Sequence, residues 1–155
     1  MIVYRIAHPD YANQLNGYGA WLKGGRWNNQ GEWMLYTAQH ASLAILELLA
    51  HIRGIKAQIP YIITRINLHD SPSISLENFS HPIPSNWSES VNGFRLTRKI
   101  GSDWLRNKTS AILEVPSIHS PFEKNYLINP HHEGLKIQLE DKSWYLHDFR
   151  LFPGQ

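Results

Sequence analysis

Residues 39–53 constrain the fold of this chain more than any other stretch, because they form a helix pattern that is apolar on almost every face. A helix that is apolar all round belongs in the interior of a protein. Gly54 follows directly and is typical of a residue that ends a helix. We therefore expect this helix to be buried. Its apolar side chains are Leu43, Ala44, Ile45, Leu46, Leu48, Leu49, Ala50 and Ile52.

The length and composition indicate one globular domain over residues 1–155, with 42% hydrophobic and 18% charged residues. The absence of cysteine excludes a disulfide framework, a thiol nucleophile and thiolate zinc ligands. The formal net charge of +2 is too small to argue for nucleic-acid binding. The first residues lack a signal-peptide pattern, and no apolar run approaches the roughly 20 residues of a membrane span. We expect a cytoplasmic protein without a membrane segment.

Short strands and a few helices alternate along the rest of the chain, which indicates an α+β fold. Residues 94–105 fit a helical pattern that is interrupted near Gly101. Residues 13–29 are expected to be irregular, and residues 70–90 are expected to form a long surface loop. The strands are expected at residues 2–6, 34–37, 59–68, 111–115, 126–128, 135–139 and 149–152.

Glu47 is an anomaly in the middle of the apolar helix. A carboxylate in such surroundings is costly unless it is paired or hydrogen-bonded. It is therefore either part of a buried ion pair, on a partly solvated edge, or an active-site group that opens into a cleft. His40 and His51 share its helix face. A metal site is not expected, because helix residues seven apart are roughly 10 Å from each other.

The segment Lys-Gly-Gly-Arg-Trp-Asn at residues 23–28 combines two glycines with an arginine. The glycines permit close backbone approaches, and the planar guanidinium of Arg26 matches a phosphate or a carboxylate. The segment is not a phosphate-binding P-loop, because no Gly-Lys-Ser or Gly-Lys-Thr follows at the required spacing. The alternative is a glycine-rich turn with a surface arginine.

A third polar group follows the expected strand at residues 111–115, beginning with Ser117. A serine that leaves a strand through a proline is well placed for the rim of a pocket. There is no Gly-x-Ser-x-Gly elbow, so a nucleophilic serine is not expected. Asn129 and Pro130 indicate a turn, and the adjacent His131 and His132 are expected to diverge rather than share a metal.

These three groups, in this order, resemble the RES domain family. The family is named after an Arg, a Glu and a Ser, which here match Arg26 in GGRWN, Glu47 in SLAILELLAH and Ser117 in VPSIHSPFEKNYLINPHH. The resemblance extends to Gly31 with residues 34–38, to Gly101 with Trp104 and Leu105, and to a closing strand at residues 148–151. It covers nearly the whole chain apart from a variable loop at about residues 70–90.

The resemblance implies a split, ADP-ribosyltransferase-like sheet with a few flanking helices, and NAD⁺ as the substrate. Arg26 is then expected to hold the pyrophosphate, and Glu47 to stabilise the positive charge that develops on the ribose. Tyr36 is expected to stack on nicotinamide or to hydrogen-bond near the reacting centre. Ser117 is expected to hold Arg26 or the ribose in place. The remaining expected contacts to NAD⁺ come from Gly25, Trp27, Asn28 and Asn129, and no metal is expected.

The resemblance further implies a toxin of a bacterial type II toxin–antitoxin system that depletes NAD⁺ by cleaving the nicotinamide–ribose bond. Water as acceptor gives a glycohydrolase, phosphate gives a phosphorylase, and a protein side chain gives an ADP-ribosyltransferase; the sequence does not separate them. An Xre-like antitoxin is expected to block the active site, and a toxin homodimer is conceivable. The alternatives from other classes are a non-catalytic nucleotide- or peptide-binding module and a nucleic-acid-cleaving toxin.

Overall fold

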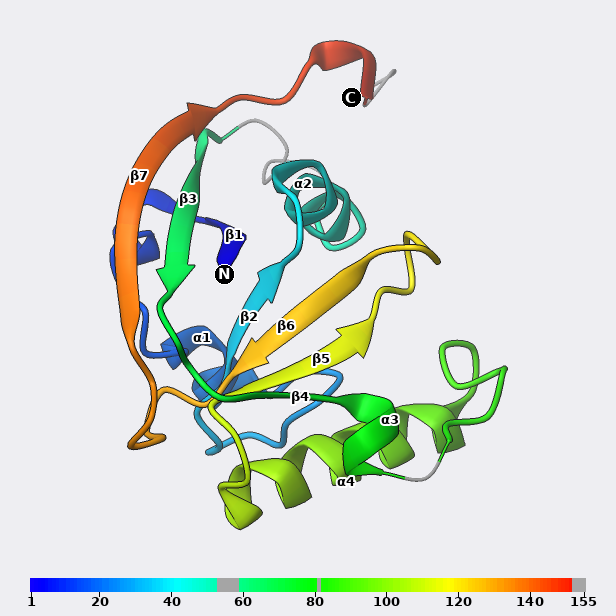
Figure 1. Cartoon of the computed structure of the whole chain (residues 1–155). Coiled ribbons are helices and arrows are strands. Elements are labelled where there is room, and N and C mark those ends of the chain that lie inside the picture. The colour runs from blue at the N-terminus through cyan, green and yellow to red at the C-terminus, as the bar shows by residue number, and fades with distance from the viewer. Residues whose placement is uncertain (53–58, 81, 152–155) are drawn as a thin grey trace.

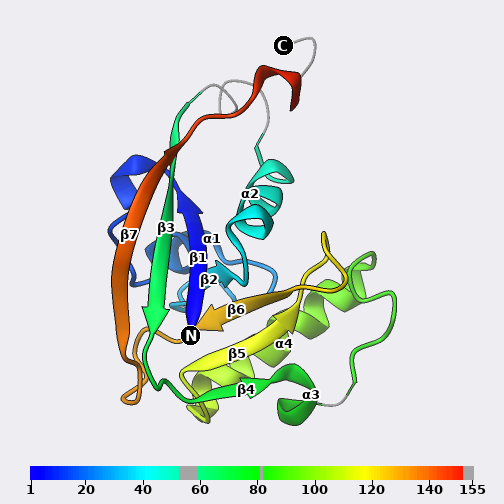
Figure 2. The ribbon, with the colours of Figure 1, turned by 45° about the horizontal axis from the view of Figure 1, so that its top comes forward.

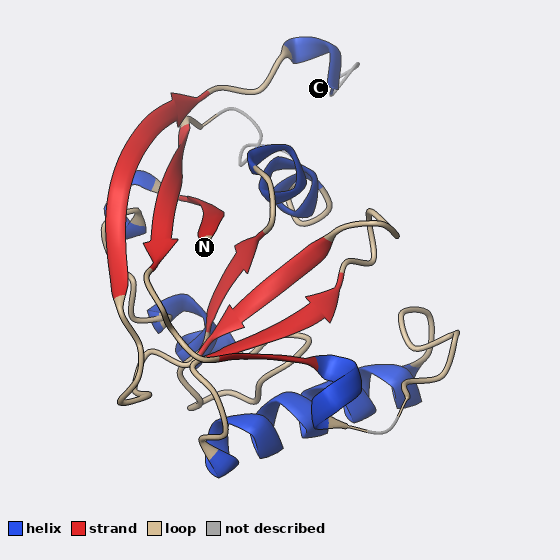
Figure 3. Ribbon diagram, in the orientation of Figure 1, coloured by secondary structure: helices blue, strands red, loops and turns tan. Residues whose placement is uncertain are grey.

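The computed structural model describes residues 1–52, 59–80 and 82–151. Within them, seven strands form one sheet in the order β4-β5-β6-β2-β1-β3-β7. The α+β class is confirmed (Figure 3). The strands are β1 (Ile2–Ala7), β2 (Leu35–Ala38), β3 (Tyr61–Leu68), β4 (Ser73–Ser75), β5 (Ile112–Pro116), β6 (Lys124–Ile128) and β7 (Ile137–Tyr145). The helices are α1 (Tyr18–Lys23), α2 (Ala41–Leu49), α3 (Leu76–Phe79) and α4 (Val91–Asn107), with 3₁₀ turns at Pro9–Tyr11 and Phe149–Leu151.

The sheet splits between β1 and β2. β1 pairs with β3 along its whole length, whereas it meets β2 at the single pair Tyr4↔Ala38. The two halves, β1-β3-β7 and β2-β6-β5-β4, therefore diverge from one junction, as Figures 1 and 2 show. The expected split sheet is thus confirmed, and the opening provides the space in which a site can form.

Two of the apolar clusters pack the two halves of the sheet. One contains Val3, Ile66 and Ile128 and joins the strands across the junction. The other packs α4 against the β4-β5-β6-β2 half through Trp104 and Leu113, both fully buried. Figure 1 shows α4 running along this half, with α2 at the opening.

The expected helix at residues 39–53 is present as α2, but it is not buried all round. His40 is its N-cap residue, and the helix ends at Leu49 with Ala50 as its C-cap, earlier than expected; Arg53 and Gly54 lie outside the described residues. Leu43 and Ala44 pack on Tyr4 and Ala38 at the sheet junction, while Leu46 is 41% exposed on the other side. The apolar pattern predicted the helix correctly and its complete burial wrongly, because one face of α2 borders the open part of the sheet.

Gly101 does not interrupt its helix. α4 runs unbroken through it, and a Cβ at this position would lie 1.8 Å from the main-chain oxygen of Trp27. The glycine is therefore required by close packing of α4 on the segment that carries Arg26, which residue periodicity alone cannot distinguish from a helix break.

Several other expectations need correction. Residues 13–29 include α1, and residues 70–90 include β4, which pairs in parallel with β5, and α3. The segment at 149–151 is a 3₁₀ turn rather than a closing strand, and residue 152 lies outside the described residues. The sheet edge is formed by β7, which is longer than expected because it follows β3 to Tyr145.

No helix among the described residues is long and apolar enough to cross a membrane.

Candidate active site

A cavity of about 630 Å³ lies where the sheet opens. Cavities of roughly 300–1,000 Å³ are typical of small-molecule sites. Its walls come from β1, β2, α2, the 23–27 segment and the hairpin between β5 and β6. Of the described residues that line it, Arg5, Lys23 and Arg26 are cationic and Glu47 is acidic. The lining therefore carries an excess of positive charge that suits an anionic ligand.

Glu47 projects from α2 into this cavity and is held by two neutral donors. Its Oε1 accepts hydrogen bonds from Ser117 Oγ at 2.9 Å and from Asn125 Nδ2 at 2.6 Å. Its Oε2 lies 3.5 Å from His119 Nε2, and the Glu47 side chain is 27% exposed. The carboxylate is therefore neither a conventional buried ion pair nor a solvated surface group. One oxygen is fixed by the protein, and the other is available to a ligand.

The hydroxyl of Ser117 makes three hydrogen bonds in the hairpin that supports Glu47. Its Oγ donates to Glu47 and accepts from the backbone N–H groups of His119 at 3.0 Å and Ser120 at 3.2 Å. These contacts use the donor and both lone pairs of a hydroxyl group. Ser117 is 5% exposed. The geometry agrees with a positioning role, although the group that it positions is Glu47 rather than Arg26.

Asn125 reaches Glu47 because of strand register. β6 pairs with β2 so that Asn125 lies opposite Ala38, directly before α2 begins. The sequence analysis did not select Asn125. The signal available for it was a polar residue on the same strand face as the fully buried Leu127.

Arg26 contacts two aromatic rings. Its guanidinium carbon is 5.5 Å from the centre of the Trp87 ring and 5.1 Å from that of Phe94. The buried Nη1 of Arg26 has no hydrogen-bond partner among the described residues. Desolvation lowers the pKa of Arg26, and the charge of Glu47 opposes this shift. The guanidinium thus has two cation–π contacts and no acidic ion-pair partner among the described residues.

Tyr36, on β2, fixes the turn that presents Arg26. Its hydroxyl accepts from the backbone N–H of Trp27 at 3.0 Å and donates to Asn28 Oδ1 at 2.8 Å. Burial raises the pKa of Tyr36, so the phenol stays protonated. A Cβ on Gly25 would lie 2.5 Å from this hydroxyl, which explains the glycine. The Tyr36 ring lines the cavity, while its hydroxyl is engaged by the protein.

The expected binding residues fall into two groups. Gly25, Arg26 and Trp27 line the cavity. Asn28 is outside the lining and fully buried, and its amide donates to the main-chain oxygens of Ala20, Asn29 and Glu32. Asn129 is also outside the lining, because it follows the opposite end of β6 and its Oδ1 closes a turn by accepting from the His131 N–H. The structure thus gives Asn28 and Asn129 roles in holding the fold.

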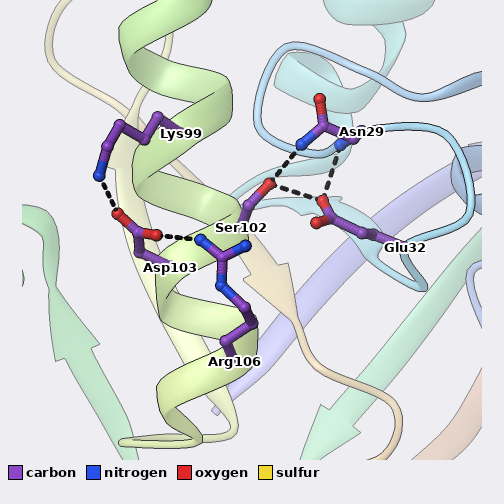
Figure 4. A network of polar contacts seen from close by, with 6 residues as sticks. All are labelled: Asn29, Glu32, Lys99, Ser102, Asp103 and Arg106. Carbon is purple, nitrogen blue, oxygen red and sulfur yellow. Dashed lines mark hydrogen bonds and ion pairs between the residues drawn. The ribbon is translucent and has the colours of Figure 1, made fainter.

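The segment after Arg26 is pinned to α4 by a polar network, shown in Figure 4. Ser102 Oγ donates to Glu32 Oε2 at 2.6 Å and accepts from Asn29 Nδ2 at 2.8 Å. Thr97 Oγ1 donates to the main-chain oxygen of Arg26 at 3.0 Å. The position of Arg26 therefore depends on α4. Lys99, Asp103 and Arg106 form a separate exposed network on the same helix.

Of the three residues selected from sequence order, Arg26 and Glu47 line this cavity, and Ser117 lies behind Glu47 and contacts its carboxylate. His119, Trp87 and Phe94 were not selected, since their roles depend on a hairpin, a loop and a helix whose contacts are not visible in local patterns. Among the described residues, no group of three or more His, Asp or Glu side chains is placed to hold a metal ion.

Together these features define a class of protein: a single α+β domain whose split sheet holds a cationic cavity around one oriented carboxylate. The RES domain model matches residues 2–148, and the chain belongs to the RES domain family. The family expectation is confirmed over nearly the whole chain.

Two relatives and one solved structure describe the similarity. The chain is 37% identical over 140 residues to "Toxin Res" of Yersinia enterocolitica serotype O:8 / biotype 1B, covering 90% of each chain. It is 33% identical over 142 residues to "Prs ADP-ribosylating toxin" of Sphingobium sp. strain YBL2, covering 90% of this chain and 88% of the relative. The fold resembles a chain of the M. tuberculosis MbcT–MbcA toxin–antitoxin complex, with a TM-score of 0.70, 16% identity, and coverage of 94% and 84% of the two chains.

Proposed function

We propose that this chain is the toxin of a toxin–antitoxin pair and that it cleaves the nicotinamide–ribose bond of NAD⁺ in the cytoplasm. The observation that carries the proposal is Glu47, with one oxygen fixed by Ser117 and Asn125, in the same cavity as the partly unpaired guanidinium of Arg26. The toxin names of the curated relatives and the toxin–antitoxin complex with the same fold support it.

The cavity suits a dinucleotide because its cations match the pyrophosphate. Arg26 and Lys23 both line the cavity, and the buried Nη1 of Arg26 has no hydrogen-bond partner among the described residues. Gly24 and Gly25 lie between them and also line the cavity, so the phosphate oxygens would lie beside this glycine segment. Binding of the pyrophosphate here directs the rest of the molecule along the cavity, past Glu47.

The proposed role of Glu47 is electrostatic stabilisation of the transition state. Cleavage of the nicotinamide–ribose bond builds positive charge on the ribose, and an oriented carboxylate stabilises that charge most strongly where water is scarce. Ser117 and Asn125 fix Oε1, so Oε2 is oriented before the substrate arrives. Nicotinamide leaves as a stable neutral molecule, so the proposed cleavage requires neither a metal nor a covalent intermediate.

Transfer of ADP-ribose to a protein side chain is the second candidate function. It is supported by the name of the Sphingobium relative, which describes an ADP-ribosylating toxin. NAD⁺ labelled in its adenylate moiety distinguishes the two: hydrolysis or phosphorolysis leaves the label in a small molecule, whereas transfer leaves it on a protein band. A non-catalytic nucleotide- or peptide-binding module leaves NAD⁺ intact.

An antitoxin that covers the cavity is the partner that this function requires, because uncontrolled loss of NAD⁺ stops growth. The fold match to one chain of a solved toxin–antitoxin complex supports such a partner. An Xre-like protein remains our expectation for its class, and a toxin homodimer within the complex remains a further possibility to be tested by mass measurement of the purified complex.

The first test is the cellular NAD⁺ level after induced expression of the native chain, E47Q and R26A. We expect a rapid fall with the native chain and none with either variant, because each removes a charge that faces the substrate. E140Q and R65A are the matched controls, since these residues form an ion pair on the outer strands β3 and β7. A steady NAD⁺ level during growth arrest by the native chain contradicts the proposal.

A further inference from the structure

The hairpin between β5 and β6 places His119 beside the free oxygen of Glu47. The backbone N–H of His119 is bound by Ser117 Oγ at 3.0 Å, so the serine that orients Glu47 also anchors His119. The His119 side chain is 29% exposed and lines the cavity, and its Nε2 lies 3.5 Å from Glu47 Oε2. A single hydroxyl thus contacts both the Glu47 carboxylate and the backbone of the residue that carries the imidazole.

The distance between these two atoms is informative. At 3.5 Å, Nε2 and Oε2 are farther apart than in a normal N–H···O hydrogen bond of about 2.7–3.2 Å. Two atoms at this separation can both contact one additional oxygen atom that lies beside them. Because Oε2 is the carboxylate oxygen left for the substrate, such an oxygen lies next to the reacting ribose.

The other groups that face His119 across the cavity are less suited to accept a proton there. Arg26 is a cation, and the hydroxyl of Tyr36 already donates and accepts within the 25–28 turn. His51, two residues beyond the end of α2, lines the same cavity, but its Nδ1 contacts the main-chain oxygen of Glu47 at 2.7 Å, whereas His119 lies beside the carboxylate itself. Lys23 is a further cation of the lining. Neutral imidazole accepts a proton readily near neutral pH.

We propose that His119 is a catalytic base that takes the proton of the acceptor which replaces nicotinamide. This inference rests on the proposed function and adds the acceptor side of the reaction. The acceptor in this step is a water molecule that contacts both His119 Nε2 and Glu47 Oε2.

The water oxygen forms a bond to C1′ of the ribose, and the bond from C1′ to the nicotinamide nitrogen breaks. Its electron pair leaves with nicotinamide, which becomes neutral. One water proton moves to His119 Nε2 and is released to solvent from the partly exposed ring. The products are ADP-ribose, nicotinamide and a proton, and Glu47 remains ionised throughout.

The test is NAD⁺ cleavage by the purified native chain, H119Q and H119A over a range of pH. Glutamine keeps a polar group beside Glu47 but cannot accept a proton at neutral pH. We expect kcat to fall about 100-fold in H119Q, within the usual contribution of general acid–base catalysis. We expect KM for NAD⁺ to change much less, and the dependence of kcat on pH to differ from that of the native chain. Added imidazole is expected to restore activity to H119A.

The control is H40Q, since His40 also pairs with a carboxylate of this hairpin, Glu123, but does not line the cavity. It is expected to leave kcat and the pH profile unchanged. If the native chain cleaves NAD⁺ and H119Q keeps its kcat and pH profile, the role of His119 is refuted while the proposed function stands. If folded H119A is slow but imidazole does not rescue it, His119 is a structural partner of Glu47 and the inference fails. If the native chain does not cleave NAD⁺, both proposals fail together.

Discussion

The arrangement around Arg26 shows how a charge can be oriented without using its hydrogen bonds. The Trp87 and Phe94 rings both contact the guanidinium of Arg26, and Phe94 also packs on Arg98, whose guanidinium carbon lies 4.6 Å from the ring centre. A carboxylate partner would fix the guanidinium equally well but would occupy the N–H donors that a phosphate needs. Aromatic contacts leave those donors available, which suits a residue that must release its product.

Replacing Phe94 by leucine tests this arrangement. The variant keeps an apolar side chain of similar length but removes the aromatic face, worth about 1–2 kcal/mol in a partly desolvated site. We expect KM for NAD⁺ to rise about 10-fold in F94L, with a smaller change in kcat, measured by steady-state kinetics.

Phe122→Leu is the matched control, because Phe122 is 96% exposed and is absent from the cavity lining. It should leave KM unchanged. An unchanged KM in F94L, in a protein that melts at the native temperature, would show that the rings do not orient Arg26.

At the level of elements, the position of α4 decides where the Arg26 segment lies. Gly101 brings the helix against the main-chain oxygen of Trp27, and Thr97 and Ser102 add hydrogen bonds to the same segment. One face of a single helix therefore supports the phosphate side of the proposed site, whereas the carboxylate side depends on α2 and a hairpin.

Gly101→Ala is predicted to separate α4 from this segment. The new Cβ would lie 1.8 Å from a backbone oxygen, so the helix must shift. Overpacking of this kind costs about 1–3 kcal/mol, which lowers the melting temperature by roughly 2–12 °C in a domain of this size. The measurement is thermal unfolding followed by circular dichroism.

Gly19→Ala provides the opposite case, since nothing lies within 4 Å of a Cβ at this helical glycine of α1. The substitution is expected to be neutral or to raise the melting temperature slightly, because alanine favours a helix. Equal effects of the two substitutions would contradict the packing argument for Gly101.

For the whole molecule, the split of the sheet means that a ligand in the cavity contacts both halves. The halves meet in the backbone ladder at one pair between β1 and β2, and the cavity is lined from both. A bound dinucleotide therefore adds contacts between parts that the ladder joins weakly, and it stabilises the native state by mass action.

ADP-ribose, which has no nicotinamide bond to cleave, is the probe for this effect. At a concentration of about 100 times its Kd, binding adds about 2.7 kcal/mol and raises the melting temperature by roughly 5–10 °C. In R26A we expect the shift to disappear at the same concentration, whereas R65A keeps it. A shift that survives unchanged in R26A would place the pyrophosphate elsewhere.

Glu47 and Arg26 could be selected from sequence because each is marked by its local surroundings. Glu47 interrupts an apolar helix, and Arg26 follows two glycines, so both could be selected before any contact was known. Asn125 and His119 conflict with nothing locally, because their roles arise from strand register and from a hairpin turn. The burial of α2 was overestimated for a related reason: residue pattern gives the polarity of a helix, not the shape of the sheet beside it.

The hydroxyl of Ser117 has a consequence for how this protein tolerates change. One atom joins a helix, a strand end and a turn, since it donates to Glu47 and accepts from two backbone amides. Alanine removes all three links at once, and a larger polar side chain does not fit a position that is 5% exposed. A substitution at Ser117 therefore affects the turn and the Glu47 carboxylate at the same time, because both depend on the same hydroxyl group.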